Sequence, residues 1–122
     1  MKVLVIDDDK FARTVYESEL HQENIAVELS KDGEEGLTMA KKVLPDLIIM
    51  ELILTRKNGF EVIEEIKKDP KLKNVPIVVC SSLSQKADIE EAKKLGIAKY
   101  LSKEDYSLKQ VVKEVMNVLM GL

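Results

Sequence analysis

The sequence of 122 residues lacks tryptophan and has only one cysteine, three prolines and five glycines. A single cysteine cannot form an internal disulfide, which argues against a disulfide-stabilised secreted domain. No apolar run approaches the roughly 20 residues that a membrane-spanning helix requires. The first segment, MKVLVIDDDK, turns acidic after six residues, unlike a signal peptide. These absences predict a cytoplasmic protein that does not enter a membrane.

The charged residues give no sign of a polyanionic partner. The 19 basic and 22 acidic residues are interspersed along the sequence and leave a net charge of −3. Binding to nucleic acid or to a membrane surface favours a concentrated basic patch, so neither is predicted. The hydrophobic share of 45% and the charged share of 34% are typical of a soluble globular protein. We expect one domain over residues 1–122.

Apolar runs of strand length alternate with helical patterns along the sequence. Continuous apolar runs, rich in β-branched residues, indicate strands that are covered on both faces. These runs are 3–6, 25–29, 47–50, 75–80 and 97–101. Between and after them, apolar residues recur at spacings of three and four, which is typical of amphipathic helices. Pro45 and Pro70 follow the second and third helices, Gly96 is placed to end the fourth, and Ser107 to cap the fifth.

Five strand–helix repeats predict an α/β fold. Such alternation favours a doubly wound, five-stranded parallel sheet with helices on both faces and right-handed crossovers. In sheets of this kind the functional site lies outside the carboxyl ends of the strands. The residues that follow the strands are therefore the candidates for function.

Charged and hydroxyl residues stand at these strand ends. They are Asp7, Asp8 and Asp9 after the first strand, Glu51 after the third, Ser81 and Ser82 after the fourth, and Lys103 after the fifth. Neighbouring carboxylates repel one another unless a cation joins them, and carboxylate oxygens suit Mg²⁺. We interpret Asp9 as the cap of the first helix. The acidic turn after the first strand has no glycine, which argues against a dinucleotide site.

Five segments together resemble a known family. They are VLVIDDDKFAR, DGEEGL, PDLIIMELIL with NGFEVIEEIK after it, VPIVVCSSLS, and KYLSK. In order and spacing they resemble the response-regulator receiver domain of bacterial two-component systems, over essentially the whole chain. The resemblance implies a flavodoxin-like (βα)5 sheet with strand order 2-1-3-4-5. It also implies a signalling switch and not an enzyme, with a histidine kinase or phosphotransfer protein upstream and an effector protein downstream.

The resemblance implies a magnesium site and a phosphoacceptor. Asp7 and Asp8 match the acidic pair that binds Mg²⁺, and the backbone carbonyl of Ile53 would complete the site with the side chain at position 51. Receivers carry a phosphoryl-accepting aspartate at this position, whereas this chain has Glu51. Glutamate is one methylene longer, which moves the carboxylate by roughly 1 Å, enough to disturb phosphoryl transfer.

Three further residues match the switch residues of receivers. Ser81 corresponds to the hydroxyl that bonds the phosphoryl group, and Lys103 to the lysine that pairs with it. Tyr100 corresponds to the aromatic residue that turns inward when the switch is on. These roles follow from the resemblance alone.

Several interpretations of Glu51 stay open. It mimics a phosphoaspartate, or it pairs with Lys103 in a fold that never switches, or it was introduced by design, or it accepts phosphate itself, or it is a strand-end charge without a role. We expect it at the carboxyl end of the strand, facing water, metal and Lys103, so that its charge avoids full burial. A degenerate site would make the chain a phosphate-independent interaction module. A magnesium-dependent hydrolase is disfavoured, because Leu52 and Ile53 follow where such enzymes need a second aspartate.

The last helix has more apolar residues than one face can bury. Besides its core stripe it carries Met116, Val118 and Met120. An exposed apolar patch would favour a protein partner, or a homodimer formed through the fourth and fifth helices. Because no output domain follows the fifth helix, output is expected to pass through a protein partner, unless the chain is part of a longer protein.

Overall fold

The computed structural model describes all 122 residues and contains one parallel sheet. Its strands are β1 (Lys2–Ile6), β2 (Ala26–Ser30), β3 (Leu47–Met50), β4 (Ile77–Ser81) and β5 (Lys99–Ser102). They pair in the order 2-1-3-4-5, and every pairing is parallel. The predicted flavodoxin-like α/β fold and strand order are therefore confirmed.

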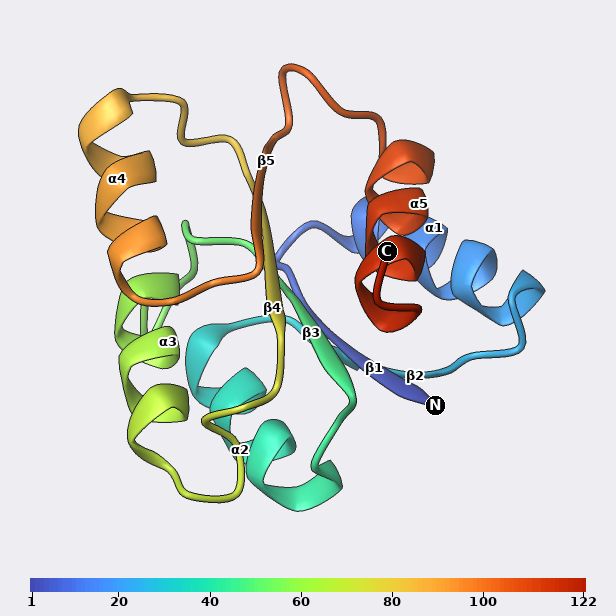
Figure 1. The fold of residues 1–122 in the computed structure, drawn as a ribbon, viewed down its shortest axis with the longest axis horizontal. Helices are drawn as coiled ribbons and strands as arrows, with labels where there is room; N and C mark the ends of the chain where they lie inside the picture. The colour runs from blue at the N-terminus through green and yellow to red at the C-terminus, as the bar shows by residue number, and fades with distance from the viewer.

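Five helices cover the two faces of the sheet (Figure 1). Helices α1 (Lys10–Gln22) and α5 (Leu108–Leu119) lie on one face. The other face is covered by α2 (Gly33–Val43), α3 (Gly59–Lys68) and α4 (Lys86–Lys94). No helix is both long and apolar enough to cross a membrane.

Three strands start later than the sequence predicts, whereas β1 starts one residue earlier, at Lys2. The runs that begin at Ile25, Val75 and Ile97 enter the sheet one or two residues later than predicted. These three residues lie in the turns before the strands, where their side chains still pack against the core. Apolar character alone does not separate a strand from a buried turn, because both contribute to the core.

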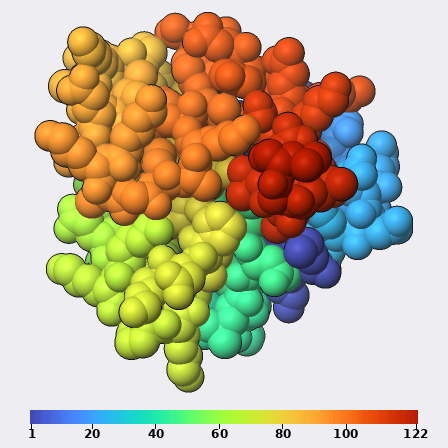
Figure 2. Space-filling view, in the orientation of Figure 1, coloured from blue at the N-terminus to red at the C-terminus, as the bar shows by residue number.

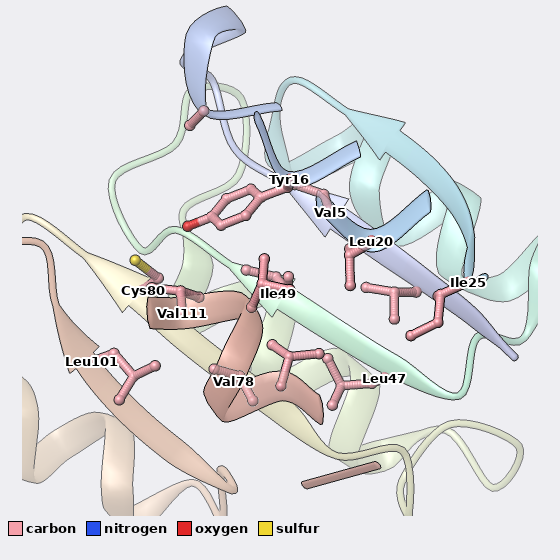
Figure 3. Packing of buried hydrophobic residues seen from close by; sticks show 14 residues of the cluster. Val5, Tyr16, Leu20, Ile25, Leu47, Ile49, Val78, Cys80, Leu101 and Val111 are labelled. Carbon is pink, nitrogen blue, oxygen red and sulfur yellow. The ribbon is translucent and has the colours of Figure 1, made fainter. Parts of the chain in front are cut away.

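Alternating side chains of the strands build two cores. Val3 and Val5 of β1 face α1 and α5, whereas Leu4 and Ile6 face α2 and α3. Each core contains 14 buried residues, and Figure 3 shows the one beneath α1 and α5. Burial on both faces explains why the strands are continuously apolar.

The predicted helix ends are present. Asp9 accepts a hydrogen bond from the Phe11 N–H at 2.9 Å and so caps α1. Ser107 and Gln110 form a reciprocal capping box at the start of α5. Gly96 follows α4 with a φ of +84°, the left-handed conformation that favours glycine.

A buried tyrosine and the single cysteine face each other in the α1–α5 core. Tyr16 is fully buried, and in Figure 3 its hydroxyl points towards the sulfur of Cys80 without a hydrogen bond of ordinary geometry. Burial raises the pKa of both side chains. The thiol is therefore protonated and shielded in the folded protein.

We expect Cys80 to be unreactive in the native state. The thiol is 1% exposed, so a reagent such as DTNB reaches it only when the core opens. Ser82→Cys, in a variant that carries Cys80→Ser, would place a thiol at an exposed position two residues away. Its rate of modification should exceed that of Cys80 by roughly a hundredfold or more. Comparable rates for the two thiols would contradict the burial of Cys80.

The apolar surface of α5 is smaller than the sequence suggested. Met116 and Val118 are partly buried against the core, and only Met120 is largely exposed, at 65%. In Figure 2 the carboxyl-terminal residues, in dark red, lie at the surface. The three side chains do not form one exposed patch, because Met116 and Val118 pack against the core that α1 and α5 share.

Candidate functional site

The carboxyl ends of four strands bring the candidate side chains together. Asp7 follows β1, Glu51 follows β3, Ser81 ends β4 and Lys103 follows β5. The backbone pairing continues past the strands: the N–H of Glu51 donates to the carbonyl of Ile6 at 2.9 Å, and that of Lys103 to the carbonyl of Ser81 at 2.9 Å. The backbone at each position is therefore fixed by the sheet.

The Glu51 carboxylate is buried and fully engaged. Its Oε1 accepts hydrogen bonds from Ser81 Oγ at 2.6 Å and from the Ile53 N–H at 3.0 Å. Its Oε2 lies 2.9 Å from Lys103 Nζ in an ion pair. The residue is only 3% exposed, so the expectation that it faces water is wrong. The three partners explain the burial, because a buried carboxylate is tolerated only when it is paired and hydrogen-bonded.

Asp7 is the second buried carboxylate of the site. Its Oδ2 lies 3.1 Å from Lys103 Nζ, and its Oδ1 accepts the Asp9 N–H at 2.9 Å. Burial raises the pKa of Asp7, and the Asp9 N–H and the Lys103 ammonium oppose this shift only in part. Arg13 Nη1 donates to the backbone carbonyl of Asp7 at 2.8 Å. Sequence reasoning missed Arg13, although it lies in the VLVIDDDKFAR segment, one helical turn after the cap of α1.

Lys103 joins the two carboxylates. Its ammonium contacts Asp7 and Glu51, which follow the neighbouring strands β1 and β3. Burial works to lower the pKa of Lys103, but the hydrogen bond to Glu51 and the charges of both acids raise it. The lysine therefore stays charged and is the counter-ion of the site.

A chain of hydrogen bonds connects Glu51 to β5. Ser81 Oγ donates to Glu51 and accepts the Leu83 N–H at 3.1 Å. Tyr100 Oη donates to the carbonyl of Leu83 at 2.6 Å. Tyr100, which is partly buried, thus reaches Ser81 through the backbone of Leu83, a link that side-chain types could not reveal.

The donor set of the site suits magnesium in its chemistry. Asp7 and Glu51 both approach the same ammonium, so two carboxylates lie close together, and the exposed Asp8 is adjacent. Glu51 Oε2 is buried and has no hydrogen bond of good geometry besides its ion pair. No three metal-ligating side chains are clustered as in a closed metal cage. Mg²⁺ needs only one or two carboxylates with carbonyl and water oxygens, so these residues fit it.

Comparison with known proteins agrees with this geometry. The family model of the response regulator receiver domain matches residues 3–115. The chain belongs to the response regulator receiver domain family. Receiver domains are signalling switches of two-component systems, and this chain is a member of that class.

Relatives of this receiver differ in length. The probable transcriptional regulator ycf27 of Guillardia theta is 31% identical over 97% of this chain, which spans 45% of that protein. The chain thus covers about half of the first curated relatives that it matches. Protein CcdB of Bacillus subtilis is 33% identical over 94% of this chain and 97% of its own length.

Solved receivers have the same fold. Chemotaxis response regulator CheY4 of Vibrio cholerae superposes with a TM-score of 0.87 at 26% identity, covering 96% of this chain and 97% of its own. The response regulator Rcp1, solved in a Mn²⁺-bound form, has a TM-score of 0.81 at 26% identity and covers 96% of this chain and 90% of its own.

The loop after Glu51 contains a strained turn in this receiver. Arg56 has a φ of +67°, and the Lys57 N–H donates to the Thr55 carbonyl at 2.7 Å, which forms a γ-turn of the rare positive-φ type. Arg56 reaches Asp32 and Glu34 at 3.6 and 3.8 Å, but its side chain is largely exposed. Exposed ion pairs of this length contribute little to stability.

Arg56→Gly is expected to stabilise the receiver. Glycine removes the strain of a left-handed conformation, about 1–2 kcal/mol, and this gain exceeds the greater entropy of glycine in the unfolded chain. The free energy of unfolding should rise by about 0.5 kcal/mol, measured by urea denaturation. Arg56→Ala keeps the strain and is the control. If both variants lose stability equally, the ion pairs and not the backbone dominate at this position.

Proposed function

We propose that this chain acts as a stand-alone receiver domain of a two-component phosphorelay in which Glu51 takes the place of a phosphorylated aspartate. The observation that supports this proposal is the set of contacts around Glu51. Its carboxylate engages the Ser81 hydroxyl and the Lys103 ammonium, the two groups that the resemblance assigns to the phosphoryl group.

The additional methylene of glutamate is what allows Glu51 to mimic a phosphorylated aspartate. It extends the negative charge beyond the position of an aspartate, in the direction in which a phosphoryl group would extend it. Ser81 is then drawn to Glu51, and through the Leu83 backbone the same connection reaches Tyr100. A local charge thereby biases a two-state element, as phosphorylation does in other switches.

Magnesium belongs to this proposal as the cofactor of the site. Asp7, Asp8 and the backbone carbonyl of Ile53 would hold the ion, beside Glu51. When bound, it would neutralise the negative charge of the acceptor position and of an incoming phosphoryl group. Lys103 contributes a second positive charge, and Ser81 supplies the hydroxyl donor.

The proposed partners follow from the family. A histidine kinase or phosphotransfer protein would approach the carboxyl edge of the sheet, and an effector protein would read the state of α4 and β5. The proposal includes a homodimer through α4 and α5. Of the three extra apolar residues of α5, only Met120 is largely exposed for such an interface. The proposed location is the cytoplasm, where a partner of a two-component phosphorelay would act.

A second function is favoured by the ion pair of Glu51. Oε1 accepts two hydrogen bonds and Oε2 is paired with Lys103, so the charge of Glu51 is balanced within the protein without a phosphoryl group. In that case the chain is a phosphate-independent interaction module. The two functions differ in whether an aspartate at position 51 restores a working switch.

Glu51→Asp is expected to become phosphorylated by acetyl phosphate with Mg²⁺. The aspartate oxygen attacks phosphorus, an acyl phosphate forms and acetate leaves, so the intact mass rises by one phosphoryl group. Glu51→Gln is the matched control and should not change in mass. The native protein should not change either, because its longer carboxylate is out of position.

Amide NMR spectra then separate the two functions. If Glu51 mimics the phosphorylated state, the native spectrum around Ser81, Leu83 and Tyr100 should match that of phosphorylated Glu51→Asp and differ from the unmodified variant. If the Asp variant takes up no phosphoryl group, the interaction module is the better account. Modification of native Glu51 would contradict the mimic.

A further inference from the structure

Eight lysines gather at the amino edge of the sheet, on the side covered by α2, α3 and α4. They occupy the last turns of these three helices and the turn after α3. This set, the lysine edge, consists of Lys41, Lys42, Lys67, Lys68, Lys71, Lys73, Lys93 and Lys94. Since helices run antiparallel to the strands in βα repeats, these helix ends lie opposite the edge that carries Glu51.

Contacts between the helix ends show that the lysine edge is continuous. Lys41 of α2 and Lys68 of α3 line the same surface hollow, and the ends of α2 and α3 lie side by side in Figure 1. Lys67 Nζ donates to the carbonyl of Lys73 at 3.3 Å. A Cβ atom at Gly96 would lie 3.9 Å from Lys67 Nζ, so the end of α3 meets the turn after α4. In Figure 2 the segment after α3, in yellow-green, projects from the lower edge.

None of the eight lysines has a carboxylate partner. The ion pairs of the protein involve other basic residues: Arg56, Lys57, Lys86, Lys99, Lys103 and Lys109. Glu65 and Asp69 line the hollow beside Lys41 and Lys68, but Glu65 pairs with Lys57 and Asp69 accepts the Lys71 backbone N–H. All of the lysines except the half-buried Lys67 are exposed. The lysine edge is therefore a surface on which lysines outnumber the acids beside them, on a protein of net charge −3.

We propose that the lysine edge is a docking surface for an acidic segment of a partner protein. Favourable interaction with helix dipoles accounts for a single lysine at each helix end. Helix dipoles do not account for Lys71 and Lys73, which lie outside the helices. They also do not explain why α5 has no basic residue in its last turn. Charge complementarity to an acidic partner accounts for all eight positions.

The composition of the lysine edge disfavours the other polyanions. Nucleic-acid surfaces commonly use arginine forks and aromatic stacking, yet Arg13 and Arg56 lie at the opposite edge and the lysine edge contains no aromatic residue. Interfacial membrane binding uses an amphipathic helix with an inserted apolar face, whereas here helix ends carry the charge. A short acidic segment can bind the lysine edge without approaching the acidic residues at the carboxyl edge of the sheet, which would repel it.

The test uses the full chain and a fluorescein-labelled oligoglutamate peptide, followed by fluorescence anisotropy. The patch variant carries Lys41→Gln, Lys68→Gln, Lys71→Gln and Lys93→Gln. The matched control carries Lys10→Gln, Lys86→Gln, Lys109→Gln and Lys113→Gln, four exposed lysines outside the lysine edge. Both variants lose the same four charges, so net charge cannot explain a difference. Circular dichroism checks that both remain folded.

We expect the native protein and the control to bind the peptide with similar affinity, and the patch variant to bind about tenfold or more weakly. Added salt should weaken native binding, because exposed charges are screened. Absence of native binding, or equal losses in both variants, would overturn the proposal. Tighter binding to phosphatidylserine vesicles or to duplex DNA than to the peptide would also overturn it, in favour of those partners. The result does not depend on the state of Glu51, which lies at the other edge.

Discussion

Lys103→Met is expected to lower the free energy of unfolding by about 3 kcal/mol. Lys103 is the only cation within ion-pair distance of Asp7 and Glu51, which are 2% and 3% exposed. Methionine keeps most of the volume and removes the charge, so two buried carboxylates are left facing each other. Removing one partner of a buried pair is strongly destabilising because the remaining charge is uncompensated. Urea denaturation in the presence of EDTA measures the change without a metal ion to replace the lysine.

Lys99→Met is the matched control for this prediction. Lys99 lies at the other end of β5 and pairs with Glu114 at 2.7 Å, but both side chains are partly exposed. Its loss should lower stability by less than about 1 kcal/mol, as for other solvated pairs. Adding Glu51→Gln to Lys103→Met should recover part of the loss, since one of the two uncompensated charges is then removed. Equal effects of the two lysine variants would show that Lys103 does not act as the counter-ion of the site.

The sequence predicted which side chains lie together where the backbone determines their positions. Asp7, Glu51, Ser81 and Lys103 lie together because four strands end at one edge, and the continuous apolar runs mark those strands. The expected contact of Glu51 with Lys103 is present, but the expected exposure of Glu51 to water was wrong. A carboxylate at a strand end can turn to water or inwards, and the choice depends on donors from two other strands and from the following loop.

Contacts made through the backbone could not be predicted from residue types. Leu83 links Ser81 to Tyr100 by its N–H and carbonyl, which every residue except proline possesses. The lysine edge was missed for a different reason. Its lysine pairs are far apart in the sequence and appear interspersed with acids, but they recur at the same interval, once in each of the second, third and fourth strand–helix repeats. This recurrence was the signal available in the sequence, and only the fold shows that it corresponds to one surface.

Gly33→Ala is expected to destabilise the receiver by about 3 kcal/mol, at the upper end for overpacking. A Cβ atom at Gly33 would lie 1.7 Å from the carbonyl oxygen of Lys57 and 2.6 Å from its carbonyl carbon. These are backbone atoms of the loop after Glu51, so no side-chain rotation relieves the clash. The loop is also held to α2 by the Gly33 N–H, which donates to the Thr55 carbonyl at 3.2 Å. Urea denaturation again measures the loss.

Gly121→Ala separates this steric effect from backbone conformation. Gly121 has a φ of +74°, which disfavours alanine, but a Cβ atom there would meet nothing within 4 Å. Its cost should stay near 1 kcal/mol or below, so a similar loss at both positions would contradict the close approach of the loop to α2. The loop connects this contact to the site, because the Ile53 N–H donates to Glu51 Oε1. If Gly33→Ala displaces the loop, the amide resonance of Ile53 should shift together with the loss of stability, whereas Gly121→Ala should leave it unchanged. The glycine of α2 would then be a determinant of how the Glu51 carboxylate is held.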